Sequence, residues 1–295
     1  MCASSQLVNV NRGGIMSGHV HCAIEDATAT VVLDNPGRRN AVSFAVLEEL
    51  RAVITTLSRS PDVRVVILSG QGSDFSVGAD LAAPAESRTL RRDSVVADTA
   101  RLRHVSTTLL AFHQIPQVTI AAIDGACAGA GLSLAAAADF RIASDRAVFN
   151  TAFISAGLSG DLGGVWLINK MLGGAHAREL FLTPGKLTAE RAHQLGLVNS
   201  VTSAQSLHGT ARELAHRLAT SAPPRPPCDE TEPAPLFHRA ARRLLARGSG
   251  SHGAVLPFRR CSRSGRGFPA QTRGRVHRPL TARVTPSTLH VRSPL

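Results

Sequence analysis

The apolar residues of this chain follow two different spacings. Short uninterrupted runs at 29–33, 64–68 and 118–123 are rich in β-branched residues, and the last two have the composition of strands buried on both faces. Between the runs, apolar residues recur every three or four positions at 46–57 and 105–112, which is typical of helices. This alternation predicts an α/β fold.

Capping residues and further runs extend the pattern. Ser43 and Thr188 are predicted N-caps, because a short polar side chain accepts hydrogen bonds from the first turn of a helix. No GxGxxG motif follows the first strand, so repeated β-β-α units in a spiral fit better than a dinucleotide-binding sheet. Further helices are predicted at 131–139, 165–172, 175–182, 188–195 and 207–218, and further strands at 140–143 and 147–149.

Two glycine-containing loops, 75–81 and 127–134, carry the strongest functional signal, because each follows a buried strand. Small residues let two backbones come close, and together the loops can direct two main-chain N–H groups at one oxygen. Such an arrangement stabilises negative charge that develops on a carbonyl, and the helix predicted after the second loop adds its positive end. Each loop taken alone fits an ordinary strand-to-helix turn equally well.

Composition limits the classes of protein that this chain can belong to. With 295 residues and 43% hydrophobic residues, it is long enough to bury a substantial core. The net charge of +12 falls almost entirely in residues 221–295, which hold 14 arginines, no lysine and three acids. Five cysteines without a CxxC pair favour a reducing compartment. Without a secretory leader or a long apolar run, we expect a cytoplasmic protein that has no membrane span.

Several motifs, in order along the chain, resemble those of the crotonase superfamily, the enoyl-CoA hydratase/isomerase proteins. They are Asn35-Pro36 with 39–42, the loop 78–81, Ile123-Asp124-Gly125 leading into 129–131, and Leu182-Thr183 through 196–198. The resemblance covers about residues 19–221. It implies an α/β spiral of β-β-α units, a site for an acyl-CoA thioester, and no cofactor apart from the CoA that the substrate carries.

The resemblance also implies roles for residues of both loops. The backbone amides of Ala79 and Ala130 correspond to an oxyanion hole that polarises the thioester toward an enolate. The segments 38–42 and 79–81 resemble those that hold the pantetheine and adenine of CoA. The candidate substrate-binding residues are Arg38, Arg39, Ala41, Gly78, Asp80, Leu81, Gly129, Ser133 and Phe153.

Side-chain chemistry departs from the family pattern. A hydratase of this family uses two glutamates, and their positions correspond here to Ser133 and Phe153, which cannot act as acid or base near neutral pH. Asp161 resembles an acid that moves a proton on the acyl chain in dienoyl-CoA isomerases. We therefore expect isomerisation or another enolate-forming reaction rather than ordinary hydration, with Asp161 as the catalytic carboxylate. Capping of the next helix explains Asp161 equally well.

Other polar residues carry weaker signals. His113 is expected in a surface or core role, Cys127 as a small buried thiol, and Asp80 as a residue that hydrogen-bonds its own turn. No cluster of Asp, Glu, His and Cys has metal-ligand spacing in the sequence. We therefore expect no metal site.

After residue 222 the chain departs from the family pattern. We divide it into a disordered extension at 1–18, a crotonase-like core at 19–205, a C-terminal helix at 206–222 and a low-order Arg/Pro-rich tail at 223–295. Codons for 228–233 and 267–280, read one base later, can encode phrases that resemble a family C-terminus. We hypothesise a reading-frame change near residue 222, with a genuine basic extension as the alternative.

The expected partners follow from the same observations. The resemblance implies an acyl-CoA substrate and a homotrimer or hexamer, although a chain without the family's C-terminal helices would lack part of the assembly surface. A catalytically inactive acyl-CoA binder or a decayed gene product is therefore an alternative to an enzyme. Nucleic-acid binding through the arginines is disfavoured, because no recognisable module accompanies them.

Overall fold

Helices and strands alternate along the part of the chain that the computed structural model describes, which is residues 6–7, 18–35, 37–84, 88–89, 91, 94–158, 160 and 162–221. All of these belong to one unit, Met1–Pro257. The helices are α1 (Phe44–Ser58), α2 (Val95–Gln114), α3 (Ala130–Ala137), α4 (Gly164–Leu182), α5 (Ala189–Gln194) and α6 (Leu207–Ser221), with a short 3₁₀ helix η2 (Ile154–Ala156). The strands are β1 (Gln6–Leu7), β2 (His19–Glu25), β3 (Thr28–Asp34), β4 (Val65–Gly70), β5 (Val118–Ile123), β6 (Ala126–Ala128), β7 (Phe140–Ser144), β8 (Val148–Asn150), β9 (Leu187–Thr188) and β10 (Ser200–Thr202).

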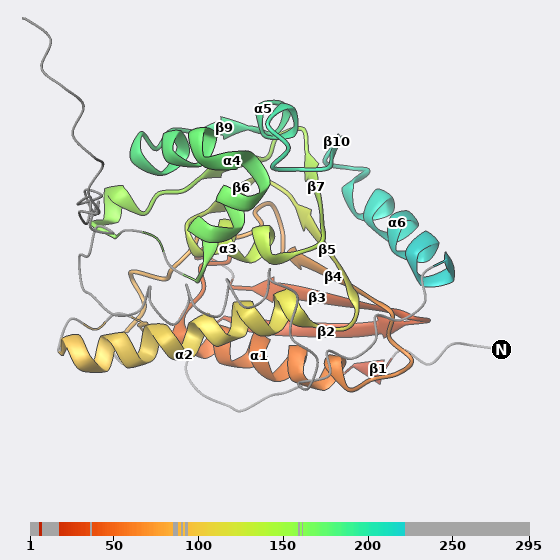
Figure 1. Cartoon of the computed structure of the whole chain (residues 1–295). Coiled ribbons are helices and arrows are strands. Elements are labelled where there is room, and N and C mark those ends of the chain that lie inside the picture. Colours follow the sequence, from red (N-terminus) through yellow and green to blue (C-terminus); the bar gives the residue numbers. More distant parts are fainter. Residues whose placement is uncertain are drawn as a thin grey trace, which may run out of the picture. The chain divides into compact units, whose positions relative to one another are not determined.

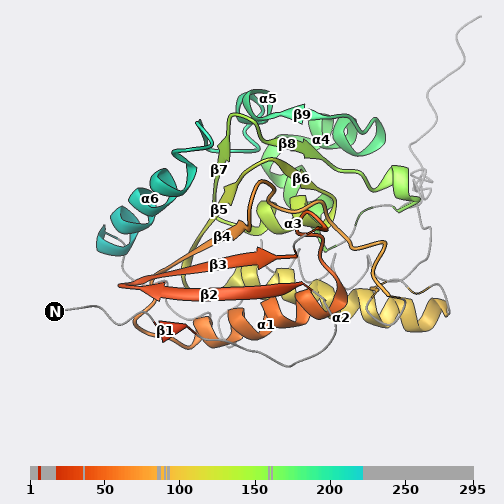
Figure 2. The ribbon, with the colours of Figure 1, turned by 180° about the vertical axis from the view of Figure 1, so that it is seen from behind.

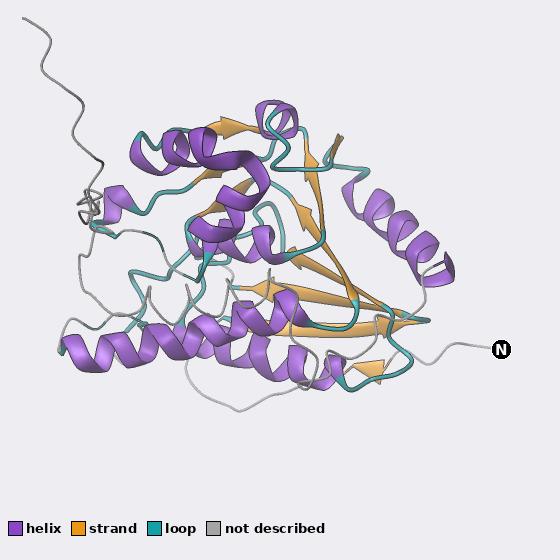
Figure 3. Cartoon of the chain, viewed as in Figure 1, coloured by secondary structure: helices purple, strands orange, loops and turns teal. Residues whose placement is uncertain are grey.

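The strands form two sheets, and helices cover the larger one on both sides (Figures 1 and 2). The larger sheet has the order β1-β2-β3-β4-β5-β7-β10, and the pairs from β3 to β10 are parallel. The smaller sheet has the order β6-β8-β9. Because β4 and β5 are parallel neighbours, their carboxyl ends lie side by side, and both glycine-containing loops begin there (Figure 3).

The central strands β4 and β5 send alternate side chains into two separate cores. In β4, Val66 and Leu68 pack into the main core with residues of α1, α2 and α3, whereas Val65 and Ile67 pack with Leu207 and other residues of α6. Burying an aliphatic side chain of this size contributes about 1.5–3 kcal/mol. The prediction that these runs are buried on both faces is confirmed.

The two predicted N-caps are confirmed. The Ser43 side chain accepts a hydrogen bond from Val46 N at 3.3 Å, and Thr188 accepts one from Arg191 N at 3.3 Å. The two helices predicted between 165 and 182 form α4, whose regular backbone is interrupted at Gly173 (φ 75°, ψ 166°). Local sequence signals were sufficient here because a cap or a glycine acts within one turn.

The apolar pattern did not indicate β1, β2, β6, β9, β10 or η2, and it placed the start of α2 too late. Strand β1 lies within the range expected to be a disordered extension and pairs with the edge strand β2, because open backbone groups at a sheet edge accept any short extended segment. Helix α2 begins at Val95, well before the first apolar position that predicted it. Its early turns bury the carboxylate Asp98 in place of an apolar residue. The remaining residues of 1–18 that precede Gly18, and the tail 223–295, lie outside the described residues.

A substitution at Gly125, between β5 and β6, tests how tightly the segments that lead into the two loops are packed. It has φ +49°, and a Cβ there would overlap the Ser73 carbonyl oxygen and lie 2.7 Å from Asp74 Oδ1. Gly72 has φ +75° but nothing within 4 Å, so Gly72→Ala isolates the backbone strain of about 1–2 kcal/mol. We expect Gly125→Ala to lower the free energy of unfolding by about 1–3 kcal/mol more than Gly72→Ala, as measured by urea denaturation. Equal losses would show that the loops can separate without cost.

Candidate active site

The two glycine-containing loops run side by side and pair through their main chains. Phe75 N donates to Asp124 O at 2.8 Å, and Ser76 N donates to Ala126 O at 3.0 Å. In the other direction, Ala128 N donates to Ser76 O at 2.9 Å. This is a short parallel ladder that continues the β4–β5 pairing beyond the ends of the strands. Two segments about fifty residues apart in the sequence are thereby held in one register.

Glycine at position 78 is what lets the loops come this close. A Cβ on Gly78 would lie 2.8 Å from Ala128 O and 3.1 Å from Ala130 N, and the residue has φ +95°. A side chain there would have to push the second loop away, besides paying for the unfavourable backbone conformation. The close approach brings the main chain around Ala79 next to the first residue of α3.

The main-chain N–H groups of Ala79 and Ala130 are both uncommitted among the described residues. Val42 pairs with the residues on either side of Ala79, accepting from Asp80 N at 3.0 Å and donating to Gly78 O at 2.8 Å, so the Ala79 amide faces away from Val42. Ala130 is the first residue of α3, where an N–H has no partner within the helix. Both alanines line the same cavity.

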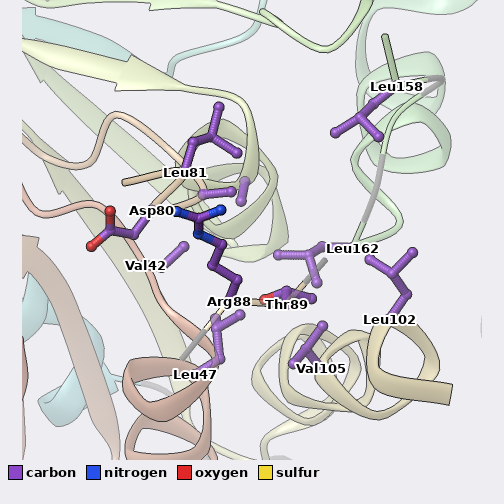
Figure 4. Close-up of a pocket in the computed structure, with 12 residues that line it drawn as sticks. Val42, Leu47, Asp80, Leu81, Arg88, Thr89, Leu102, Val105, Leu158 and Leu162 are labelled. Atoms are coloured by element: carbon purple, nitrogen blue, oxygen red, sulfur yellow. The ribbon is translucent and has the colours of Figure 1, made fainter. Parts of the chain in front are cut away.

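The cavity lies between the first loop, α1, α2 and the segment before α4, and encloses about 510 Å³ including its open mouth (Figure 4). Most of its wall is apolar, so water held there is easily displaced. The lining residues are Val42, Leu47, Ala79, Asp80, Leu81, Arg88, Thr89, Leu102, Val105, Ala130, Leu158 and Leu162.

Three predicted substrate-binding residues belong to the loop that follows Ala79 or contact it. Leu81 lines the cavity and is 65% exposed. Asp80 also lines it, and its carboxylate accepts a hydrogen bond from Ala82 N at 3.2 Å, which confirms that Asp80 bonds its own turn. Arg38 donates from Nη2 to Ala82 O at 3.0 Å. These residues hold the loop that follows Ala79 in one conformation.

Other predicted residues serve the scaffold around the loops. Gly129 is the N-cap residue of α3, with φ +50° and its N–H bonded to Asn150 O at 3.0 Å. Ala130 itself has no positive φ, so alanine fits this position without strain. Ala41 is buried, and its carbonyl accepts from Asn35 Nδ2 at 2.7 Å.

Neither Ser133 nor Phe153 is part of the cavity wall. Ser133 is fully buried on α3, and Gly164 at the start of α4 lies so close that a Cβ there would overlap the Ser133 hydroxyl. Phe153 is buried and stacks on Phe181, with ring centroids 6.0 Å apart and planes 13° apart. Asp161 lies outside the described residues. Its nearest described neighbours in sequence include Leu162, which lines the cavity.

Two carboxylates, those of Asp74 and Asp124, accept hydrogen bonds from the main chain that leads into the second loop. Asp74 accepts from Arg39 Nε at 2.8 Å, from Arg39 Nη2 at 3.0 Å and from Ala126 N at 2.7 Å. The hydrogen bonds from Arg39 are the main reason that the pKa of Asp74 is lowered. Burial works to raise the pKa of Asp124, but hydrogen bonds from Arg146 and Ser144 outweigh it, so this pKa is also lowered. Arg39, predicted to contact substrate, is thus engaged in the scaffold.

The remaining polar candidates, Cys127 and His113, are not among the described residues that line the cavity. Burial raises the pKa of the Cys127 thiol far above neutrality, so this cysteine carries no thiolate for nucleophilic attack. His113 Nδ1 lies 3.1 Å from Ala137 O, and its ring meets Trp166 edge to face. Within the described part of the chain, no group of three His, Cys, Asp or Glu side chains is placed to hold a metal ion, and no helix is long and apolar enough to cross a membrane.

The cavity wall includes residues that sequence reasoning did not identify. Arg88 and Thr89 belong to the stretch before α2, where no periodicity marks a buried position. Leu102 and Val105 lie on α2, and their spacing of three residues was the available signal, although it predicts only a buried helix face. Whether a buried helix face packs against other side chains or lines a cavity depends on tertiary contacts, which the local sequence does not show.

Asp74 provides a test of how the loops are braced. Because its folded pKa is lowered, its contribution to stability is fully present above the ordinary aspartate pKa of about 3.9 and is lost as the pH falls through the lower, folded value. We expect Asp74→Asn to lower the free energy of unfolding by about 1–3 kcal/mol at pH 7, and the difference from wild type to shrink toward pH 3. The measurement is denaturant unfolding across this pH range. Asp62→Asn, at an exposed carboxylate, is the control; a pH-independent loss for Asp74→Asn would contradict the assignment.

Comparison with known proteins agrees with this geometry. The family model for enoyl-CoA hydratase/isomerase matches residues 23–225. A probable enoyl-CoA hydratase of Mycobacterium leprae is 37% identical over 195 residues, which are 65% of this chain and 66% of the relative, so the match spans just under two thirds of that relative's length. The 1,2-epoxyphenylacetyl-CoA isomerase of Escherichia coli is 32% identical over 197 residues, 67% of this chain and 74% of the relative.

Solved structures show the same fold. A Thermobifida fusca protein in complex with acetoacetyl-CoA superposes with a TM-score of 0.64 at 28% identity, covering 77% of this chain and 84% of that one. The crotonase-like α/β fold predicted from the motifs is therefore confirmed. The chain belongs to the enoyl-CoA hydratase/isomerase family of the crotonase superfamily.

Proposed function

We propose that this chain is an enzyme that acts on an acyl-CoA thioester, with the thioester oxygen held between the N–H groups of Ala79 and Ala130. The observation that carries the proposal is that two uncommitted amides from separate loops line one cavity with a largely apolar wall. It is supported by a relative that is named as an isomerase of a CoA thioester and by a neighbour that binds acetoacetyl-CoA. The reaction belongs to lipid or acyl-CoA metabolism.

The two amides stabilise charge because they are already in place. When a proton leaves the carbon next to the thioester, negative charge moves to the oxygen, and two fixed N–H donors receive it without rearranging. The N-terminal end of α3 adds the partial positive charge of a helix dipole at the same point. An apolar wall excludes water, which strengthens both effects.

Asp161 is proposed as the carboxylate that moves the proton. Leu158 and Leu162, its near neighbours in sequence, both line the cavity. Ser133 and Phe153 supply no titrating group, so the chemistry rests on one carboxylate. An isomerase or another enolate-forming reaction needs only one group to take a proton from carbon and return it elsewhere, whereas two-glutamate hydration also needs a second group to hold water.

The remaining roles complete this proposal. The segments 38–42 and 79–81 hold the CoA moiety, and the chemistry needs no cofactor beyond it. A cytoplasmic location and a trimeric or hexameric assembly stay predictions, as does the reading-frame change. The family match ends at residue 225, close to the predicted break at 222. The inactive binder is less well supported, because the relatives are named as enzymes.

Ala130→Pro tests the oxyanion role, because proline removes the N–H while remaining favourable at the first position of a helix. We expect kcat/KM for thioesters to fall roughly a hundredfold to a thousandfold. Binding of an alkyl-CoA thioether, which has no carbonyl oxygen, should be nearly unchanged. Full turnover by Ala130→Pro would refute the role, and lost thioether binding would show that the proline had blocked the cavity.

Asp161→Asn separates an enzyme from an inactive binder. A panel of enoyl- and dienoyl-CoA thioesters is assayed with wild type and variant, and thioether affinity is measured by calorimetry. We expect turnover to fall by roughly a hundredfold or more, with affinity retained, because asparagine keeps the shape but cannot accept the proton. Asp145→Asn, on the exposed β7–β8 turn, is the control. If wild type turns over no thioester in the panel, the hypothesis of an inactive acyl-CoA binder replaces that of an enzyme. If turnover is unchanged in Asp161→Asn, Asp161 is assigned to helix capping instead of catalysis.

A further inference from the structure

One cationic side chain lies on the otherwise largely apolar wall of the cavity. Among the lining residues that the structure describes, Arg88 alone is positively charged, and the others are apolar except for Thr89 and Asp80. Figure 4 shows the stem of Arg88 extending past Leu47 with its guanidinium toward the loop that carries Leu81. Arginine stays charged under all ordinary conditions, so this charge is a permanent property of the cavity.

Hydrogen bonds hold the guanidinium at the wall. Arg88 Nε donates to Ala83 O at 2.6 Å, which leaves the two terminal nitrogens for other acceptors. The neighbouring residue Thr89 accepts at its carbonyl from Arg101 Nε at 3.2 Å. Arg101 is itself paired with the fully buried Asp98. A buried ion pair on α2 therefore fixes the backbone next to Arg88.

No carboxylate of the described residues neutralises Arg88. Asp80, the acidic residue on the same wall, is engaged with Ala82 N at 3.2 Å and lies 4.0 Å from Arg38 Nη1, and it makes no ion pair with Arg88. Among the described residues, the partner of the Arg88 side chain is the carbonyl oxygen of Ala83. Arg88 therefore brings to the described part of the wall a positive charge with which a carboxylate of a ligand can pair.

We propose that the acyl group taken by this cavity carries a carboxylate, and that Arg88 is the residue that selects it. The inference rests on the proposed function, because it places the acyl chain in the cavity beyond Ala79 and Ala130. A carboxylate on that chain would accept two parallel hydrogen bonds from the terminal nitrogens of Arg88. The substrate class is thus a monothioester of a dicarboxylic acid with CoA.

The phosphates of CoA are the other source of anionic oxygens. One observation favours the acyl group. Arg88 shares its cavity with Ala130 and with Leu102 and Val105 of α2, whose apolar side chains suit an acyl chain. The phosphates are also common to all CoA thioesters, so the two sources make different predictions.

The experiment compares two non-hydrolysable CoA thioethers of equal length, 5-carboxypentyl-CoA and its methyl ester, together with CoA alone. Affinities are measured by calorimetry for wild type, Arg88→Met and Arg59→Met. Methionine keeps an unbranched stem while removing the charge. Arg59 is exposed and follows α1 about 18 Å from Leu47, so it controls for the change in net charge. Circular dichroism and thermal unfolding check the fold of each variant.

We expect wild type and Arg59→Met to bind the carboxylate thioether about tenfold to a hundredfold more tightly than the ester, and Arg88→Met to lose this preference while binding the ester with little change. No preference in wild type, or a preference that survives in Arg88→Met, would overturn the inference alone. Equal losses in Arg88→Met for both thioethers and CoA would assign Arg88 to the phosphates and overturn it as well. If wild type binds neither thioether, the proposed function fails together with the inference.

Discussion

The structure around the cavity depends on main-chain pairing between two loops that are distant in sequence. Ser76 and Cys127 form a parallel bridge, and the hydrogen bonds on either side of it continue the β4–β5 ladder past the strand ends. Gly78 and Gly131 make this possible, because a Cβ on Gly131 would lie 2.6 Å from Ser76 O. Without that contact, the amide of Ala79 and the start of α3 would not share one wall.

A site built from backbone tolerates changes of side chain that a site built from acids and bases does not. Ala130 presents the same N–H as glycine would, because it has no positive φ. Ser133 packs against Gly164 and Phe153 against Phe181, so both side chains are part of the packing between elements. The amides on the cavity wall belong to other residues, Ala79 and Ala130, so they are present whatever side chains occupy positions 133 and 153.

Sequence reasoning succeeded where the deciding interactions are local. The caps Ser43 and Thr188, the doubly buried strands and the close-packing glycines all leave a signal within a few residues. The glycines that follow two buried strands also predicted the pairing of the two loops, and the family motifs agreed with it. Sequence reasoning failed where tertiary contacts override local pattern, as in the first turns of α2, which bury Asp98 because Arg101 neutralises it. Arg88 was missed for the same reason: nothing in the surrounding residues shows that it faces a cavity.

The distribution of charge around the cavity follows from these constraints. Asp74 and Asp124 lie beneath the loops, where Arg39 and Arg146 hold both carboxylates ionised and hydrogen-bonded to the turns. Their charges therefore help to fix the backbone of the turns. The described part of the cavity wall is largely apolar, with the amides of Ala79 and Ala130 at one place and the guanidinium of Arg88 at another. In an apolar wall a charge is weakly screened, so the position of each polar group affects a ligand more than the number of such groups does.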